Sequence, residues 1–315
     1  MRTDVRRWFD RHTYRGSAAP PVAELVAAKT GSVSVILPAR DEAATVGDVV
    51  RAIRPLCAAG LVDELLVMDD GSRDGTPTVA SRAGAEVIAT ADVLPGHGAR
   101  PGKGDVLWKA LHAATGDIVV YLDADLQGVS AAWVTGLLWP LLADPAVSLV
   151  KACYDRPLAL PDSPVTPGGG RVTELAARPL INLLWPRLAG LIQPLAGEYA
   201  GRRALLEQLP YDSGYAVELG LLIDALAVVG LDGLAQVDLG IRRHRHQGTD
   251  ALGRMAAGIV AAALDRSGTQ LHGHELVQFV RDGAVLIAVE TPLRADARPP
   301  MLSVPEYTAR RARAS

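Results

Sequence analysis

Two aspartates one residue apart, Asp123 and Asp125, directly follow the hydrophobic segment 117–122. Side chains two positions apart in an extended chain point to the same side, so both carboxylates can lie together at a strand end. Carboxylate oxygens in this arrangement suit a hard divalent cation that also binds phosphate oxygens. Such a cation can neutralise the charge that develops on a departing diphosphate. The alternative is that the two acids form a turn or cap a helix, and their place after a buried strand favours the metal site.

Acidic side chains also follow two other apolar segments. Residues 64–68 lead into a loop that contains Asp70, and the run SVSVILP at 32–38 leads into a loop that ends with Glu42. Carboxylates at strand ends can accept hydrogen bonds from a base or a ribose. For Asp74, at the end of the second loop, the alternative is that it only caps the helix that follows.

Two glycine-flanked basic segments could bind anions. Lys103 stands in the turn RPGKG before a predicted helix, where its ammonium and nearby amides could contact phosphate. Arg171 follows three glycines, 168–170, which would let the backbone approach an anion at a helix N-terminus. Its guanidinium can then pair with a carboxylate or phosphate. The alternatives are a basic turn without a ligand at Lys103 and a flexible hinge with a solvated Arg171.

Two histidines, His244 and His246, follow a predicted strand and are interleaved with arginines that include Arg242. One imidazole could complete the metal site begun by Asp125, with the arginines facing phosphate. The sequence contains no GxSxG, GxGxxG or P-loop pattern, which argues against the common hydrolase and dehydrogenase classes.

These residues depend for their positions on an alternation of short apolar segments with helical patterns. The alternation is typical of an α/β fold with a mostly parallel sheet between helices. Ligands then bind beyond the carboxyl ends of the strands, so we expect the loops after Leu37, Met68 and Leu122 to meet in one site. We predict strands at 32–38, 64–68, 85–89, 117–122 and 235–241, and helices at 22–29, 42–55, 76–83, 106–114, 171–184, 216–229 and 251–264.

The composition limits the class of protein. The 315 residues carry 32 Lys plus Arg against 35 Asp plus Glu, so no basic field predicts nucleic-acid binding. The sequence predicts neither a membrane span nor a secretion signal. Cys57 and Cys153 lack CxxC spacing and are expected to be buried thiols in a reducing cytoplasm. Residues 1–30 are expected to be a polar lead-in that ends in a short helix, and residues 294–315 to wrap the surface or fray.

Seven segments taken in order resemble the glucosyl-3-phosphoglycerate synthase family, an actinobacterial group of retaining GT-A glycosyltransferases. The likeness extends from about residue 22 to residue 301. The first four segments alone indicate only a GT-A enzyme, and the last three are far more specific. The segments are PARDE at 38–42, DDGS at 69–72, RPGKG at 100–104, DAD at 123–125, GGGRVTEL at 168–175, PLAGEY at 194–199 and GYAVE at 214–218.

The resemblance implies transfer of glucose from UDP-glucose to the 2-hydroxyl of 3-phosphoglycerate with retention of configuration. It implies Mg²⁺ or Mn²⁺ as the cofactor and a homodimer as the assembly. It also implies a GT-A fold with a Rossmann-like nucleotide-binding half and an acceptor-binding half. The expected divisions are an N-terminal extension at 1–30, the nucleotide-sugar half at 31–154, the acceptor half at 155–282 and a C-terminal extension at 283–315.

The resemblance assigns roles to single residues as well. Asp125 and His244 would hold the metal, Lys103 would lie beside the nucleotide, and Leu195 would offer its backbone carbonyl near the reacting hydroxyl. With Glu218, which would position donor sugar or acceptor, Asp125, Lys103 and Leu195 are the candidate catalytic residues. The expected donor contacts are Pro38, Ala39, Arg40, Glu42, Asp70, Lys103, Asp123, Ala124 and Arg242, and the expected acceptor contacts are Gly170, Arg171, Thr173 and Tyr215.

Three loops depart from the usual family sequence: ARDEA stands for ALNEE, DDGS for DSGS and DAD for DSD. All three belong to the expected nucleotide pocket, so the main alternative is a mannosyl-3-phosphoglycerate synthase that uses GDP-mannose or GDP-glucose. Another metal-dependent GT-A glycosyltransferase and a nucleotide-sugar-binding regulator without catalysis also remain as alternatives. A sugar-phosphate nucleotidyltransferase normally has a glycine-rich N-terminal loop, and residues 37–42 contain no glycine. No carboxylate is an obvious covalent nucleophile, so we expect front-face attack in which the leaving phosphate takes the acceptor's proton.

Overall fold

The structure is a computed structural model that describes residues 1–155, 157–158, 166–167, 170–242, 248–293 and 296–314. Among these residues, the central element is an eight-stranded sheet in which only β9 runs antiparallel to its neighbours, β5 and β6. The predicted α/β fold with a mostly parallel sheet is therefore confirmed. From edge to edge the strands are β1 (Thr13–Arg15), β11 (Leu234–Ile241), β6 (Leu149–Asp155), β9 (Tyr199–Arg202), β5 (Ile118–Tyr121), β2 (Val33–Ala39), β3 (Glu64–Asp69) and β4 (Glu86–Ala89).

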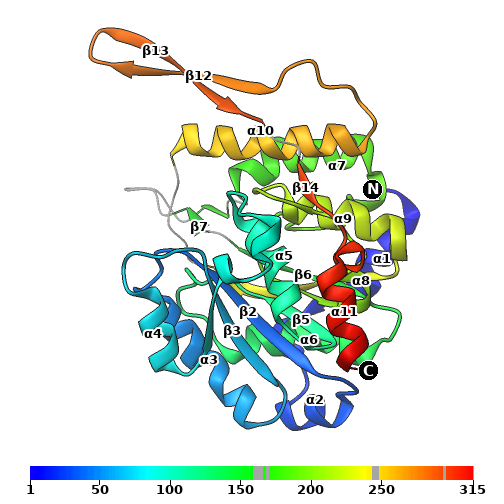
Figure 1. Cartoon of the computed structure of the whole chain (residues 1–315). Coiled ribbons are helices and arrows are strands. Elements are labelled where there is room, and N and C mark those ends of the chain that lie inside the picture. The colour runs from blue at the N-terminus through cyan, green and yellow to red at the C-terminus, as the bar shows by residue number, and fades with distance from the viewer. Residues whose placement is uncertain (156, 159–165, 168–169, 243–247, 294–295, 315) are drawn as a thin grey trace.

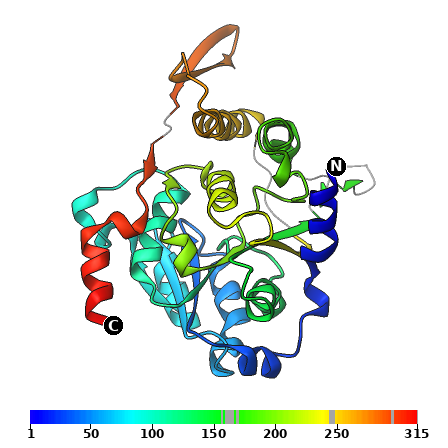
Figure 2. The same cartoon turned by 90° about the vertical axis from the view of Figure 1, so that its right-hand side faces the viewer.

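Helices cover both faces of the sheet (Figure 1; Figure 2). Successive side chains of a strand point to opposite faces, so Val35 packs in one core and its neighbour Ile36 in the other. Among the described residues, no helix combines the length and the apolar character that a membrane span requires. The first core contacts α2 (Val22–Ala28), α3 (Val46–Ala58), α4 (Thr76–Ala83) and α6 (Ala131–Ala143), and the second contacts α1 (Thr3–His12), α5 (Lys103–Ala113), α9 (Val217–Val229), α10 (Thr249–Arg266) and α11 (Pro305–Ala314).

Three predicted helices differ from the structure in ways that affect the loops. α5 begins at Lys103 rather than at residue 106. α3 begins at Val46 rather than at residue 42, because the N–H groups of the preceding loop bond to side chains of the loop after β3 and of the first residue of α4. The predicted helix at 171–184 contains the π-helical segment η4 (Thr173–Ala177) before α7 (Arg178–Leu184). Pro179 has no N–H to donate, which favours such an irregular turn.

Two expectations about burial are wrong. Residues 1–30 are not only a polar lead-in, because α1 buries Val5 and Trp8 and β1 extends the main sheet by pairing with β11. The Trp8 indole donates to the Leu234 carbonyl at 2.8 Å, which fixes α1 on the sheet. Cys153 is buried as expected, but Cys57 is only half-buried because it lies near the end of α3.

The C-terminal segment packs against α5 instead of fraying. β14 (Ala297–Arg298) pairs with β10 (Tyr211–Asp212), and Tyr307 of α11 is fully buried. The remaining short elements are α8 (Arg203–Leu206), β7 (Pro157–Leu158), β8 (Thr166–Pro167), and the turns η1 (Gly16–Ala18), η2 (Thr90–Asp92), η3 (Pro95–His97), η5 (Pro186–Leu188) and η6 (Met301–Ser303).

A hairpin that the sequence analysis did not predict projects from the body (Figure 1; Figure 2). It consists of β12 (Glu275–Asp282) and β13 (Val285–Pro292), which pair only with each other. The Gln278 side chain of β12 contacts Arg254 and the Asp250 carbonyl of α10. The hairpin is therefore attached to the body through α10.

Candidate active site

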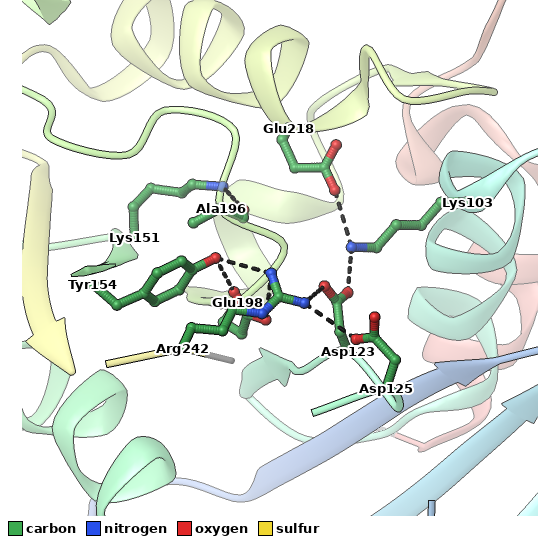
Figure 3. Close-up of polar contacts among 9 residues, drawn as sticks. All are labelled: Lys103, Asp123, Asp125, Lys151, Tyr154, Ala196, Glu198, Glu218 and Arg242. Carbon is green, nitrogen blue, oxygen red and sulfur yellow. Dashed lines mark hydrogen bonds and ion pairs between the residues drawn. The ribbon is translucent and has the colours of Figure 1, made fainter. Parts of the chain in front are cut away.

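Lys103, the first residue of α5, links two carboxylates at the carboxyl edge of the sheet (Figure 3). Its Nζ lies 2.5 Å from Asp123 Oδ1 and 3.0 Å from Glu218 Oε1. A Cβ at Gly104 would lie 1.7 Å from the Asp212 carbonyl oxygen, so this glycine lets α5 start close to the neighbouring backbone. Burial opposes protonation of Lys103, but the carboxylates of Asp123 and Glu218 outweigh it and raise the pKa of the ammonium. Lys103 is thus a fixed cation.

Asp123 and Asp125 lie on the same side of the chain, as the spacing predicts. Arg242, just after β11, donates through Nη2 to both, at 2.8 Å from Asp123 Oδ2 and 3.1 Å from Asp125 Oδ1. Burial would raise the pKa of Asp123, but Lys103 and Arg242 outweigh it and lower that pKa. The Asp125 side chain is 39% exposed against 20% for Asp123, so Asp125 is the carboxylate more open to a ligand.

Two residues to which the sequence analysis gave no role, Tyr154 and Glu198, contact the Nη1 atom of Arg242. Arg242 Nη1 lies 3.1 Å from the Tyr154 hydroxyl and 3.3 Å from Glu198 Oε1. The Tyr154 hydroxyl donates to Glu198 Oε2 at 2.7 Å. Burial raises the pKa of Glu198, although Arg242 opposes this. Glu198 could have been found from its place in PLAGEY, whereas Tyr154 carried no signal.

The loops after β2 and β3 are joined side by side. The Asp70 N–H donates to the Ala39 carbonyl at 2.9 Å, and Arg40 Nη1 lies 3.4 Å from Asp70 Oδ2. Burial raises the pKa of Asp70, and Arg40 opposes it. Asp74 instead has a structural role, because its carboxylate accepts from the Ala43 N–H at 2.9 Å. The other expected donor contacts lie along the same edge: Pro38 and Ala39 end β2, Glu42 follows in the loop, and Ala124 is buried between the two aspartates.

A tight turn presents Leu195 beside this cluster. The Ala196 N–H donates to the Gln193 carbonyl at 3.0 Å, which closes a β-turn with Pro194 and Leu195 at its centre. A Cβ at Gly197 would lie 2.5 Å from Lys103 Nζ. The chain after the turn therefore lies directly against the Lys103 ammonium.

The expected acceptor contacts lie at the starts of two helical segments. Arg171 and Tyr215 are exposed, while Thr173 is buried in η4 and Gly170 is half-buried. Within the described parts of the chain, no hydrogen bond joins Gly170, Thr173 or Tyr215 to the residues of Figure 3. His244 lies outside the described residues. The printed contacts thus join several of the donor-side candidates to one another.

Comparison with known proteins decides the family. Residues 34–160 match the family model described as Glycosyl transferase family 2. A glucosyl-3-phosphoglycerate synthase of Mycolicibacterium smegmatis is 46% identical over 299 residues, which are 95% of this chain and 98% of that protein. This chain belongs to the glucosyl-3-phosphoglycerate synthase family.

Solved structures support the same family and fold. The glucosyl-3-phosphoglycerate synthase of Mycobacterium tuberculosis, in complex with Mn²⁺, UDP-glucose and phosphoglyceric acid, has a TM-score of 0.84 at 43% identity and covers 92% of this chain and 98% of its own. A mannosyl-3-phosphoglycerate synthase of Rubrobacter xylanophilus has a TM-score of 0.86 at 39% identity and covers 95% and 99%. The predicted GT-A glycosyltransferase fold is confirmed.

The ligands expected for a divalent metal ion in a glucosyl-3-phosphoglycerate synthase fit what the structure shows. Mg²⁺ commonly binds through one or two carboxylates together with substrate phosphates, and Asp125 offers a partly exposed carboxylate. Among the described residues, no group of three or more His, Cys, Asp or Glu side chains could hold an ion alone.

Proposed function

We propose that this chain transfers glucose from UDP-glucose to the 2-hydroxyl of 3-phosphoglycerate with retention of configuration. The observation that carries the proposal is the ion-pair cluster of Lys103 and Arg242 with the paired aspartates, placed at the carboxyl edge of the sheet. The glucosyl-3-phosphoglycerate synthases that resemble this chain over nearly its whole length support the choice of substrates.

The donor side of the reaction needs positive charge at the leaving diphosphate. Lys103 and Arg242 are held by buried carboxylates, so their charges are in place before the substrate binds and need no reorganisation. Asp125 and His244 would hold Mg²⁺ or Mn²⁺, which supplies further neutralisation of the diphosphate when bound. Asp70 and Arg40, which contact each other, would line the uridine of the nucleotide.

The acceptor side needs an anion site and a hydroxyl held at the sugar. Arg171, with Gly170 and Thr173, would bind the phosphate or carboxylate of 3-phosphoglycerate, and Tyr215 would help to position it. The Leu195 carbonyl would accept a hydrogen bond from the reacting hydroxyl. Glu218 is engaged with Lys103, which supports front-face attack over a covalent intermediate on this carboxylate.

The proposed donor-binding and acceptor-binding residues come from different parts of the sequence. Residues 31–154 supply the donor loops and 155–282 the acceptor candidates, with extensions at 1–30 and 283–315. We also propose the cytoplasm as the compartment, which the two unpaired thiols of Cys57 and Cys153 support.

We further propose a homodimer that uses the β12–β13 hairpin. A two-stranded hairpin is marginally stable alone, and exposed apolar side chains that gather on one element are typical of an interface with another chain. Light scattering after gel filtration should give the mass of two 33.1 kDa chains, and Phe279→Asp should shift it towards one. A wild-type mass of one chain would refute the dimer. The exposed apolar residues of the hairpin are Val277, Phe279, Val280, Val285, Leu286, Ile287 and Val289.

A turnover assay tests the function directly. UDP-glucose, GDP-glucose and GDP-mannose are each offered with 3-phosphoglycerate and Mg²⁺, and nucleoside diphosphate release and product mass are measured. We expect release that depends on 3-phosphoglycerate with UDP-glucose. Preference for GDP-mannose would instead assign the chain the activity in the name of the Rubrobacter xylanophilus relative. No release with any donor would refute the acceptor assignment.

A further inference from the structure

Lys151 is a buried lysine in β6, whose segment LVKACYD is otherwise buried up to its last residue, the exposed Asp155. Only 2% of its surface is exposed. Its neighbours Val150 and Ala152 pack in the core on the opposite face, so Lys151 points to the face that α5 and α9 cover. Its Nζ lies 4.7 Å from the centre of the Tyr199 ring, the residue paired with it across β6 and β9. The sequence analysis and the proposed mechanism give this side chain no role.

The Lys151 ammonium donates a hydrogen bond to the Ala196 carbonyl (Figure 3). Ala196 is the last residue of the β-turn that presents Leu195, and its N–H closes that turn. The peptide that carries the Leu195 carbonyl therefore ends at the residue that Lys151 holds. Two residues later, the Glu198 carbonyl accepts from the Ala152 N–H at 3.0 Å, so β6 fixes the segment at two points.

The charged groups around Lys151 come from four separate parts of the chain. Glu218 comes from α9, Lys103 from α5, Asp123 from the end of β5, and Glu198 from the residue before β9. Burial, and to a smaller extent the Lys103 charge, lower the pKa of Lys151, which the three carboxylates oppose, with a net value of about 8. A buried charge that the fold holds at a cost in stability is typical of functional sites.

We propose that Lys151 is a positioning residue of the transferase, which holds the Ala196 carbonyl so that the Leu195 carbonyl meets the acceptor hydroxyl. This inference rests on the proposed function. Its effect is on the geometry of attack rather than on donor affinity, because Lys151 contacts the turn and not the loops expected to bind the nucleotide. Misplacement of a reacting group by about 1 Å can lower a rate by about 100-fold.

The test compares Lys151→Met with Lys109→Met. Lys109 is also buried at 1% exposure and donates to a backbone carbonyl, that of Thr90 at 3.1 Å, but it lies on α5 outside the site. We expect Lys151→Met to lower kcat by about 10- to 100-fold, while UDP affinity with Mn²⁺, measured by calorimetry, stays within about threefold. Lys109→Met should leave kcat per folded molecule unchanged.

Three results would overturn the inference: unchanged kcat in Lys151→Met, a parallel loss of UDP binding and kcat, or an equal loss in Lys109→Met. If Lys151→Met does not fold, Lys151→Gln, which keeps a polar donor, is measured against the same control. Wild-type turnover is measured first, so the failure of the proposed function is seen separately as absence of transfer by the unaltered enzyme.

Discussion

The Lys103 ammonium lies 3.0 Å from Glu218 Oε1 and joins the first residue of α5 to the first turn of α9. The pair connects residues 31–154 to residues 155–282, the proposed donor and acceptor halves. The Glu218 side chain is only 7% exposed, so its carboxylate is held by the cation that is also expected to assist the leaving group. A carboxylate fixed in this way suits orientation of the sugar better than covalent attack on it.

Glu218→Gln tests this relationship. The change removes the charge that holds Lys103 while the shape is kept, and we expect kcat to fall by about 10- to 100-fold. Mass spectrometry of wild type under turnover should show no glycosyl-enzyme adduct. An adduct that is trapped in wild type and absent in Glu218→Gln would make Glu218 the nucleophile and end the front-face proposal.

Asp125→Asn should remove the metal-dependent part of the reaction. Because the side chain is partly exposed and its contact with Arg242 is one of several that Arg242 makes, the fold should persist. We expect kcat to fall by about 100-fold or more and the Mn²⁺ dependence of UDP binding to disappear. The control is Asp48→Asn in an exposed ion pair of α3. Retained Mn²⁺ dependence in Asp125→Asn would place the metal elsewhere.

Arg171→Ala should weaken the binding of the acceptor and leave the binding of the donor unchanged. Loss of a guanidinium on an anion should raise the KM for 3-phosphoglycerate by about 10-fold or more, with the KM for UDP-glucose unchanged. Arg187→Ala, another exposed arginine just after α7, is the matched control. Acceptor kinetics that do not change in Arg171→Ala would move the anion site to other residues.

Local patterns were sufficient to predict that the candidate donor residues would meet at one edge of the sheet. The loops after β2, β3 and β5 meet because parallel strands carry their carboxyl ends to one edge. The spacing of Asp123 and Asp125 then determined that one group could contact both.

The other features of the fold and the site depend on pairing between strands that are distant in sequence, so the sequence did not reveal them. β1 joins the sheet with Thr13 paired opposite Gln236, and no local sequence pattern predicts this pairing. Lys151 and Tyr154 reach the site because the antiparallel β9 lies between β5 and β6, which brings Glu198 and the turn at Leu195 to the carboxyl edge. For Lys151, the available sequence signal was a single lysine in an apolar strand, and this signal did not indicate which residue the lysine contacts.

Lys151 should give the stability a measurable pH dependence. Burial lowers its pKa from 10.5 to about 8, so between these values the unfolded chain binds more protons than the folded chain. The cost of burying the charge is fully present below about pH 8 and is relieved as pH rises, which makes stability rise with pH in this window. Relative to Lys151→Met, wild type should gain about 2 kcal/mol between about pH 7 and about pH 9.5 in urea unfolding. A difference that stays constant with pH would show that Lys151 is not a buried cation.

Arg298 should be a main anchor of the C-terminal segment. Its Nε lies 2.5 Å from Asp105 Oδ1, both side chains are 3% exposed, and Asp105 stands in the first turn of α5, which begins at Lys103. Removing one partner of a buried pair leaves an uncompensated charge, so Arg298→Ala should lower the free energy of unfolding by about 3 to 5 kcal/mol. Arg100→Ala removes a more exposed ion pair with Asp296 in the same region and should cost about 1 kcal/mol or less. Equal costs in urea unfolding would contradict the anchor. Because Asp105 lies two residues from Lys103, we also expect Arg298→Ala to lower kcat in the fraction that stays folded, which would link β14 to the first turn of α5.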